Sequence, residues 1–251
     1  MLRLTAWDQL PDNMKNKDVI RYYESLKSKK RQLVLKRMFD VVVGICIAIV
    51  LSPVMLIISI LIKMDSKGPV MFKQERVTTN GRIFRIYKFR TMVVNAESIG
   101  TQVTTKSDSR ITRMGKILRK VRLDELPQIF NVIIGDMSFV GTRPEVPRYV
   151  AEYTDEMMAT LLMPAGITSE ASINYKDEER LLTDSENADY TYINEVLPEK
   201  MRYNLGYIVN FSVVHDLKVM INTIIAVLKK DSEKEEVKDI EHKDCQIRIE
   251  S

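Results

Sequence analysis

An apolar stretch from Val41 to Ile62 constrains the fold of this chain more than any other feature. A straight helix of that length would just cross the hydrocarbon core of a bilayer, which is roughly 30 Å thick. Ser52 and Pro53 interrupt its middle. Pro53 has no N–H to donate to the carbonyl of Ile49, so the helix must bend there, and the Ser52 hydroxyl could satisfy part of the freed backbone.

Basic residues flank this apolar stretch on both sides. Lys36 and Arg37 precede it, and Lys63 and Lys67 follow it. A simple transmembrane span places its excess of Lys and Arg on one side only. A re-entrant helix-break-helix over residues 36–63, which enters and leaves the bilayer on the same face, accounts for both the bend and the charges. A kinked full span and a buried core helix are the two alternatives.

The rest of the chain divides around this membrane segment. Residues 1–35 form a polar arm without a cleavable signal pattern, which we interpret as a short surface helix or a loose arm. We expect residues 64–228 to form one compact cytosolic domain and residues 229–251 to form a charged tail. We therefore expect a mainly α protein with a small β-hairpin, of the α+β class.

The hairpin is the clearest β signal. Two strand-like segments, residues 70–76 and 82–87, are joined through Asn80-Gly81, a dipeptide typical of tight hairpin turns. Further along, we interpret residues 135–145 as an ordered loop and residues 164–168 as a turn. Helices are expected from Pro147 to about Met158, over residues 189–206, and over residues 217–228, whose apolar stripe is typical of a core helix or of a helix on a membrane surface.

Composition excludes several classes of protein. The two cysteines, Cys46 and Cys245, lie far apart, so neither a disulfide framework nor a zinc site follows. The two histidines, His215 and His242, lie near no Ser or Cys motif, which argues against a Ser-His or Cys-His hydrolase. The formal net charge is +4, and the tail is more acidic than basic. The remaining basic excess suits anionic lipid, nucleotide phosphate or nucleic acid equally.

Two adjacent acids, Asp124 and Glu125, precede an apolar stripe that is typical of an amphipathic helix ending at Gly135. We place Asp124 at the N-cap and Glu125 in the first turn, where the helix dipole favours an ionised carboxylate. In a structural interpretation Asp124 caps the helix and Glu125 pairs with Arg122. In a functional one the acids supply a nucleophile or a metal ligand beside cations that hold phosphate.

Cations surround these acids in the sequence. The preceding segment, residues 115–123, is expected to bury Ile117, Leu118 and Val121 and to direct Arg119 elsewhere. Further cations that could hold a phosphate or lie at a solvated edge are Lys88 and Arg90 at the end of the hairpin, Arg143 just before Pro144, and Lys176 among acids.

Four motifs carry a resemblance to a known family. They are Lys36-Arg37 with Asp40 ahead of Ser52-Pro53; Gly68-Pro69-Val70 to Gln74; Lys88-Phe89-Arg90-Thr91-Met92; and Leu118 to Asn131 with Gly135-Asp136-Met137-Ser138. Through them the chain from about Lys36 to Leu228 resembles the bacterial sugar transferases of the small monotopic phosphoglycosyl transferase type.

The resemblance implies an enzyme and a mechanism. Asp124 would be the nucleophile that attacks a UDP-sugar, forms a phosphosugar-enzyme and releases UMP, after which undecaprenyl (polyprenyl) phosphate accepts the phosphosugar. Glu125 would assist together with Mg2+, and Arg119 would contact phosphate. The remaining expected substrate contacts are Lys88, Arg90, Arg143 and Lys176.

The same resemblance implies a place in the cell and a set of partners. We expect a monotopic protein of the bacterial cytoplasmic membrane whose catalytic domain faces the cytoplasm, and whose partners are the UDP-sugar, polyprenyl phosphate and the lipid bilayer. A homo-oligomer is left open. A membrane-anchored scaffold without turnover is the main rival. A nucleic-acid binder is not expected, because residues 110–122 lack interleaved aromatics, and adjacent acids suit a glycosidase poorly.

Overall fold

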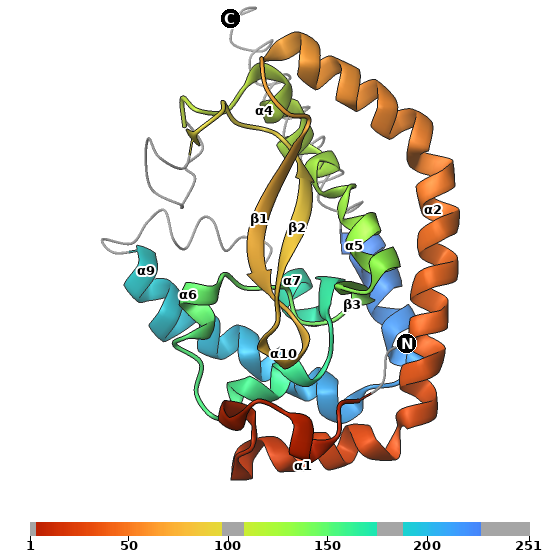
Figure 1. The fold of residues 1–251 in the computed structure, drawn as a ribbon, viewed down its shortest axis with the longest axis vertical. Coiled ribbons are helices and arrows are strands. Elements are labelled where there is room, and N and C mark those ends of the chain that lie inside the picture. Colours follow the sequence, from red (N-terminus) through yellow and green to blue (C-terminus); the bar gives the residue numbers. More distant parts are fainter. Residues whose placement is uncertain (1–3, 97–107, 175–187, 227–251) are drawn as a thin grey trace, which may run out of the picture.

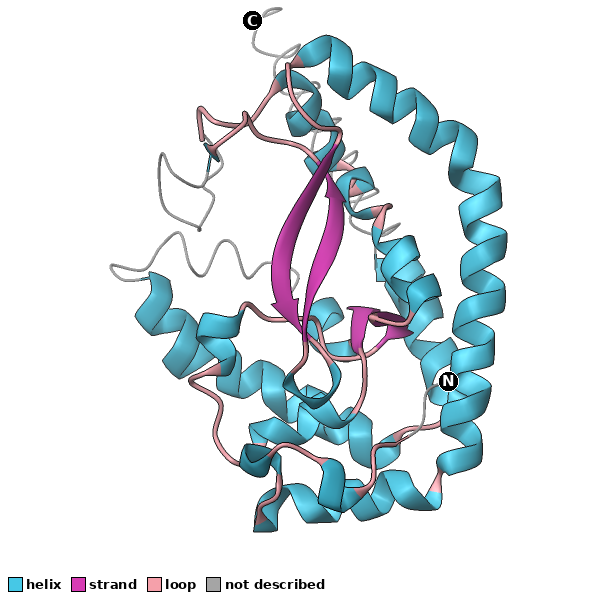
Figure 2. Ribbon diagram, in the orientation of Figure 1, coloured by secondary structure: helices cyan, strands magenta, loops and turns pink. Residues whose placement is uncertain are grey.

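The computed structural model describes residues 4–96, 108–174 and 188–226. A long helix, α2 (Lys30–Asp65), runs along one side of the molecule, and a twisted two-stranded ribbon lies in its middle (Figures 1 and 2). The ribbon pairs β1 (Met71–Val77) with β2 (Ile83–Phe89), and the reversal uses Asn80 and Gly81, both at positive φ. The hairpin prediction is therefore confirmed.

The other elements pack around the ribbon. The helices are α1 (Lys17–Ser28), α4 (Arg113–Lys120), α5 (Gln128–Ile134), α6 (Pro147–Val150), α7 (Glu170–Asn174), α9 (Ala188–Thr191), α10 (Leu197–Asn210) and a last helix over residues 213–226. Short 3-10 turns cover Trp7–Gln9, Asp12–Met14, Thr79–Gly81, Leu123–Glu125 and Met157–Leu162, and a π-helical turn covers Tyr192–Val196. Strands β3 (Met137–Val140) and β4 (Ala165–Thr168) form a second sheet.

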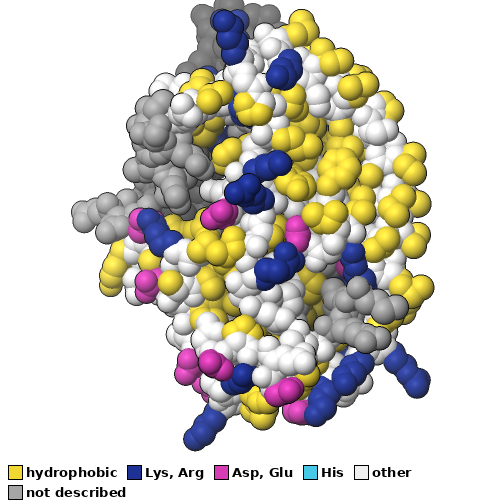
Figure 3. Space-filling view, viewed as in Figure 1, with side chains coloured by type: hydrophobic (Ala, Val, Ile, Leu, Met, Phe, Trp, Pro, Cys, Tyr) yellow, Lys and Arg dark blue, Asp and Glu magenta, His cyan; other side chains and the backbone are white. Residues whose placement is uncertain are grey.

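Among the described residues, α2 is the one helix that is long and apolar enough to cross a membrane. Only 17% of its most apolar window is buried, which counts against a core helix, and hydrophobic side chains line the edge that it forms (Figure 3). A break was predicted at Pro53, but the helix continues through this residue and curves around the body. Pro53 has no N–H to donate to the carbonyl of Ile49. As predicted, Ser52 Oγ donates to that carbonyl instead, at 2.8 Å.

Both ends of α2 are attached to the same body. Near its start, Lys36 is 2% exposed, and its Nζ donates to the Asp216 carboxylate at 2.6 Å and to the carbonyl of Val140 at 2.8 Å. At its last residue, Asp65 Oδ2 accepts the N–H of Met114 at 3.0 Å. The apolar helix is therefore held by one globular unit at both ends, and its outer face is left to the surroundings.

The polar N-terminal arm packs into the core, where a short surface helix or a loose arm was expected. Met14, Val19 and Leu26 are completely buried. Trp7 packs edge to face on Tyr23, with ring centroids 5.1 Å apart. The arm thus contributes apolar burial to the domain that follows it.

The second sheet corrects two predictions. The residues interpreted as a loop and as a turn contain β3 and β4, which pair in parallel with Met137 opposite Ala165. Their backbones approach so closely at the end of β3 that a Cβ on Gly166 would lie 2.2 Å from the nitrogen of Gly141. Strands this short and this deeply buried show no polar-apolar alternation, which is why the sequence pattern missed them.

Two helical stripes are more exposed than predicted. Ile117 and Val121 are 57% and 53% exposed, and of the three apolar residues expected inside only Leu118 is buried. In the last helix Ile221 and Ile224 are also more than half exposed, which departs from a core helix and suits the alternative of a helix on a membrane surface. The predicted helix from Pro147 ends already at Val150, in α6.

Candidate active site

Asp124 and Glu125 occupy a 3-10 turn between α4 and α5. Arg122, at the N-cap of this turn, has φ 56° and ψ 21°, a left-handed conformation that separates the turn from α4. The helix behind the acids begins only at Gln128, with Pro127 at its N-cap. The predicted N-cap role of Asp124 is therefore wrong, because the left-handed residue inserts an extra turn ahead of the helix.

Glu125 is the centre of an ion-pair cluster. Its Oε1 accepts a hydrogen bond from Lys88 Nζ at 2.9 Å and another from Arg143 Nη2 at 2.7 Å. Lys88 comes from β2 and Arg143 from the segment after β3, so neither is the predicted partner Arg122. Burial opposes the ionisation of Glu125, but Arg143 and Lys88 outweigh it and hold the pKa of that carboxyl well below its usual range.

Asp124 experiences the opposite balance. Burial, followed by the charge of Glu125, raises its pKa, although Lys88 and Arg119 act in the other direction. The expectation that a helix dipole would favour its charged form does not hold, since Asp124 lies outside the first turn of α5. A partly desolvated carboxylate is a stronger nucleophile and base than one in water.

Arg119 lies in the last turn of α4, and its Nε donates to the hydroxyl of Thr91 at 2.9 Å. The helix docks tightly there, because Thr112 N donates to the Thr91 carbonyl at 3.0 Å and a Cβ on Gly115 would lie 2.0 Å from that oxygen. Gly115 thus lets α4 approach Thr91, and Thr91 orients Arg119. Sequence reasoning did not single out Thr91 for this role.

Arg90 points inward. It is 5% exposed, its Nη1 donates to the carbonyl of Lys67 at 2.6 Å, and its Nη2 donates to the carbonyl and hydroxyl of Ser66 at 2.8 and 2.9 Å. These contacts fix the turn between α2 and β1. The structure therefore separates Arg90 from the cations on Glu125, and Lys176 lies outside the described residues.

A buried amide that sequence reasoning did not single out links Lys88 to the acids. Asn131 of α5 is fully buried, donates to the carbonyl of Arg85 at 2.9 Å and accepts the N–H of Tyr87 at 2.9 Å. It thereby fixes β2, and with it Lys88, against the helix that follows Glu125. Asn131 lies outside the predicted apolar stripe of residues 126, 129, 130 and 133, so the helical periodicity could not reveal it.

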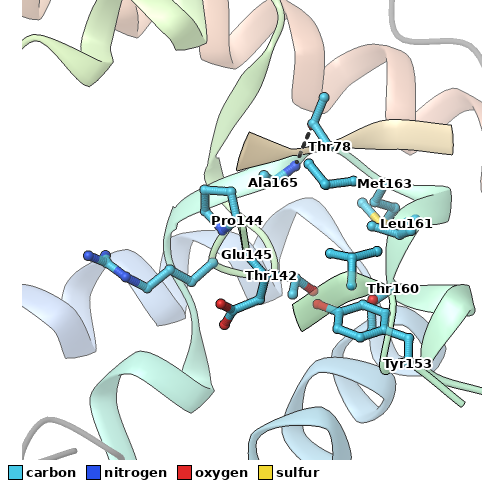
Figure 4. A pocket seen from close by; sticks show the side chains of 12 residues that line it. Thr78, Thr142, Pro144, Glu145, Tyr153, Thr160, Leu161, Met163 and Ala165 are labelled. Carbon is cyan, nitrogen blue, oxygen red and sulfur yellow. Dashed lines mark hydrogen bonds between the residues drawn. The ribbon is translucent and has the colours of Figure 1, made fainter. Parts of the chain in front are cut away.

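A small hollow is lined in part by Arg143. Figure 4 shows Thr142, Pro144, Glu145, Tyr153 and Thr160 around it, in a space large enough for about one water molecule. It is too small for a sugar nucleotide.

The acidic side chains of the site could hold a metal ion only if water and a substrate phosphate supplied the other ligands. No group of three or more metal-binding side chains occurs among the described residues. Mg2+ is commonly held by one or two carboxylates together with water and substrate phosphates. Both cations that contact Glu125 use Oε1, so Oε2 and the adjacent Asp124 suit an ion shared with a phosphate substrate. Two adjacent carboxylates thus lie beside cations of the kind that bind phosphate.

Residues 31–230 match the family described as Bacterial sugar transferase, and the chain belongs to that family. This confirms the resemblance found in the motifs.

The proteins similar to this chain include enzymes and a protein of exopolysaccharide production. Over 197 residues it is 39% identical to a UDP-N-acetylgalactosamine-undecaprenyl-phosphate N-acetylgalactosaminephosphotransferase of Aeromonas hydrophila, covering 77% of this chain and 44% of that protein. Over 196 residues it is 36% identical to a UDP-glucose:undecaprenyl-phosphate glucose-1-phosphate transferase of Klebsiella pneumoniae, covering 76% and 40%. The exopolysaccharide production protein PSS of Rhizobium leguminosarum bv. phaseoli is 34% identical over 214 residues, covering 79% and 97%. The chain thus spans less than half the length of the first two relatives.

Proposed function

We propose that this protein transfers a sugar-1-phosphate from a UDP-sugar to undecaprenyl phosphate, giving an undecaprenyl-diphosphate sugar and UMP, as a membrane step of bacterial glycan assembly. The observation that carries the proposal is the meeting of Lys88 and Arg143, from two separate segments, on Glu125, directly beside Asp124. The names of the relatives, which couple a sugar phosphate to undecaprenyl phosphate, support the same reaction.

The reaction proceeds in two displacements at one phosphorus atom. An Asp124 carboxylate oxygen attacks the phosphorus that carries the sugar, the bond from that phosphorus to the oxygen of UMP breaks, and UMP leaves with the electron pair. A phosphate oxygen of the lipid then attacks the phosphosugar-aspartyl intermediate and releases the carboxylate. Each step needs in-line positioning and neutralisation of phosphate charge.

The surrounding residues supply that charge. Glu125 stays ionised between Lys88 and Arg143 and would hold Mg2+ through Oε2, together with the diphosphate. When bound, the ion neutralises charge that develops on the phosphate oxygens. Arg119, oriented by Thr91, binds phosphate through its guanidinium group. Lys176 remains a substrate contact proposed from the sequence alone.

We also propose that α2 is re-entrant and that the protein is monotopic in the cytoplasmic membrane, with the domain facing the cytoplasm. The attachment of Lys36 and Asp65 to one body supports this, because a straight span would place its two ends on opposite sides of the bilayer. The outward-facing apolar side chains of α2 would then meet lipid.

The test separates a covalent mechanism from direct attack by the lipid. Purified protein is incubated with UDP-sugar labelled in the sugar, with Mg2+ and without lipid, then quenched rapidly. We expect label on the peptide that contains residues 123–128 and one equivalent of UMP. Asp124→Asn should abolish both, and Asp12→Asn, which changes an exposed acid, should abolish neither.

The other outcomes contradict the proposal in distinct ways. UMP released only when lipid is present, with no label on the protein, would indicate direct attack. Full turnover by Asp124→Asn would return Asp124 to a structural role. Absence of UMP under all conditions would favour the scaffold.

A further inference from the structure

The segment that carries Arg143, residues 141–146, is tied to its surroundings at both ends. At its start, Gly141 N donates to the carbonyl of Thr168 at 3.0 Å, and Gly166 N donates to the carbonyl of Thr142 at 2.8 Å. At its end, the carbonyl of Glu145 accepts the N–H of Val77 at 3.0 Å. A segment without helix or strand geometry is thus held by main-chain hydrogen bonds from two sheets.

Arg76 adds a side-chain contact from β1. Its Nη1 donates to the carbonyl of Pro144 at 3.1 Å, and its Nη2 donates to Gln74 Oε1 at 2.7 Å. The register pairs Arg76 with Phe84 and Phe72 with Lys88, which places Arg76 and Lys88 on the same face of the ribbon. Arg76 therefore contacts Pro144, the residue that follows Arg143, from the ribbon face that also carries Lys88.

A second side-chain contact holds the segment through its own residue Glu145. Its side chain is buried, its Oε1 accepts a hydrogen bond from the hydroxyl of Tyr192, and Lys200 Nζ lies 3.5 Å from the same oxygen. Lys200 also donates to the Tyr192 hydroxyl at 3.1 Å. Tyr192 begins a π-helical turn, a geometry that frequently marks functional sites.

We propose that Arg76 and the Glu145–Tyr192 pair are positioning residues that hold Arg143 in place for Glu125 and for the substrate diphosphate. Arg143 is 35% exposed and has a long, flexible side chain, so anchoring the residues after it lowers the entropy lost when it binds phosphate. The catalytic part of this inference rests on the proposed function. The structural part does not.

The experiment compares three variants in the full chain. Arg76→Gln and Tyr192→Phe each remove one support of the segment. Arg37→Gln is the matched control. Like Arg76, Arg37 donates two hydrogen bonds through its guanidinium group, but to the main-chain carbonyls of Val132 and Ile133, at the far end of α5. Hydrogen exchange of residues 141–146 is measured without substrate, and each variant is also made in an Arg143→Gln background for steady-state kinetics.

We expect exchange in residues 141–146 to accelerate by about tenfold in Arg76→Gln and Tyr192→Phe, and to stay unchanged in Arg37→Gln. KM for the UDP-sugar should rise by about tenfold in Arg76→Gln with a smaller change in kcat, and Arg76→Lys should restore part of the loss. In the Arg143→Gln background the further effect of Arg76→Gln should disappear, whereas any effect of Arg37→Gln should persist.

Unchanged exchange, or an Arg76→Gln effect that is fully additive with Arg143→Gln, would overturn the inference. If Arg76→Gln does not fold, Tyr192→Phe decides, because it removes a single hydroxyl. If the wild-type protein shows no turnover, the exchange measurement still decides whether the segment is held, and only the proposed function fails.

Discussion

Arg143 lies 18 residues beyond Glu125 in the chain, and its Nη2 comes within 2.7 Å of Oε1 of that carboxylate. Lys88 reaches the same oxygen from the opposite direction along the sequence, 37 residues before Glu125. The glutamate is thus held at two points before any substrate binds. A fixed carboxylate presents one defined oxygen to an incoming ligand, which is what preorganised catalysis requires.

The two ion pairs of Glu125 predict that the stability of the fold depends on pH in the acid range. The folded-state pKa of Glu125 lies below its unfolded value, so its contribution is present above about pH 4.3 and is lost as the pH falls. In buffer with chelator, Glu125→Gln should lower the melting temperature at about pH 7, and the difference from wild type should shrink at about pH 3.5. A difference that is constant with pH would contradict this.

Asp124 should behave in the opposite way. Its pKa is raised in the folded state, so its ionisation opposes folding and this penalty appears as the pH rises through the folded-state value. Asp124→Asn should therefore leave the metal-free protein at least as stable as wild type at about pH 7, although it removes the nucleophile. A clear drop in melting temperature would show that the charge of Asp124 supports the fold.

Removing Arg119 should impair the reaction and spare the fold. A charge-assisted contact is worth about 1.5 to 3 kcal/mol, so Arg119→Ala should reduce kcat/KM by roughly tenfold to a hundredfold. Lys120→Ala removes the same charge from the next, exposed position of α4 and serves as the control. Equal kinetics of the two variants, with both substrates limiting, would remove Arg119 from the site.

Arg90 should matter for stability first. Arg90→Ala leaves the acceptors of Ser66 and Lys67 without their donor, and should lower the free energy of unfolding by about 1 to 3 kcal/mol. The folded fraction should keep a normal KM. Arg85→Ala, at an exposed position of β2, the strand that Arg90 follows, is the control for charge. A raised KM with unchanged stability would instead favour the substrate contact predicted from the sequence.

The bend at Pro53 predicts a topology. With a re-entrant α2, a tag at Met1 and a tag at the C-terminus of intact cells should both be shielded from an impermeant external label. Pro53→Leu should straighten the helix and expose a fraction of the N-terminal tags. Pro198→Ala, which changes a proline in the first turn of α10, should not. External labelling of Met1 in the wild-type protein would show a full span.

The sequence revealed the features whose chemistry is local. Asn80-Gly81 predicted the hairpin, Gly135 ends α5 with φ 97°, and Ser52 satisfies the carbonyl ahead of Pro53. Each of these depends on the conformational limits of one or two residues, which are visible in the residue type itself. The motif-based assignment to the family was also correct.

The remaining features depend on tertiary contacts that no local pattern encodes. Arg122 adopts a left-handed conformation that its residue type does not predict, and this moved Asp124 out of the helix. A cation at a strand end can meet a phosphate or a carbonyl, so Lys88 and Arg90 looked alike in sequence and differ in the fold. The parallel pairing of β3 with β4 joins segments that are both too short to show a period.

The buried pair of Lys36 and Asp216 also sets an order of events during synthesis. The two residues are 180 positions apart, and at bacterial elongation rates their separation in time is roughly 10 to 40 s. We therefore expect α2 to leave the ribosome and meet the bilayer well before its last anchor exists, so that insertion precedes docking. Nascent chains that end before residue 216 should already be bound to membranes, and the start of their α2, around Lys36, should remain sensitive to protease until the last helix has been made.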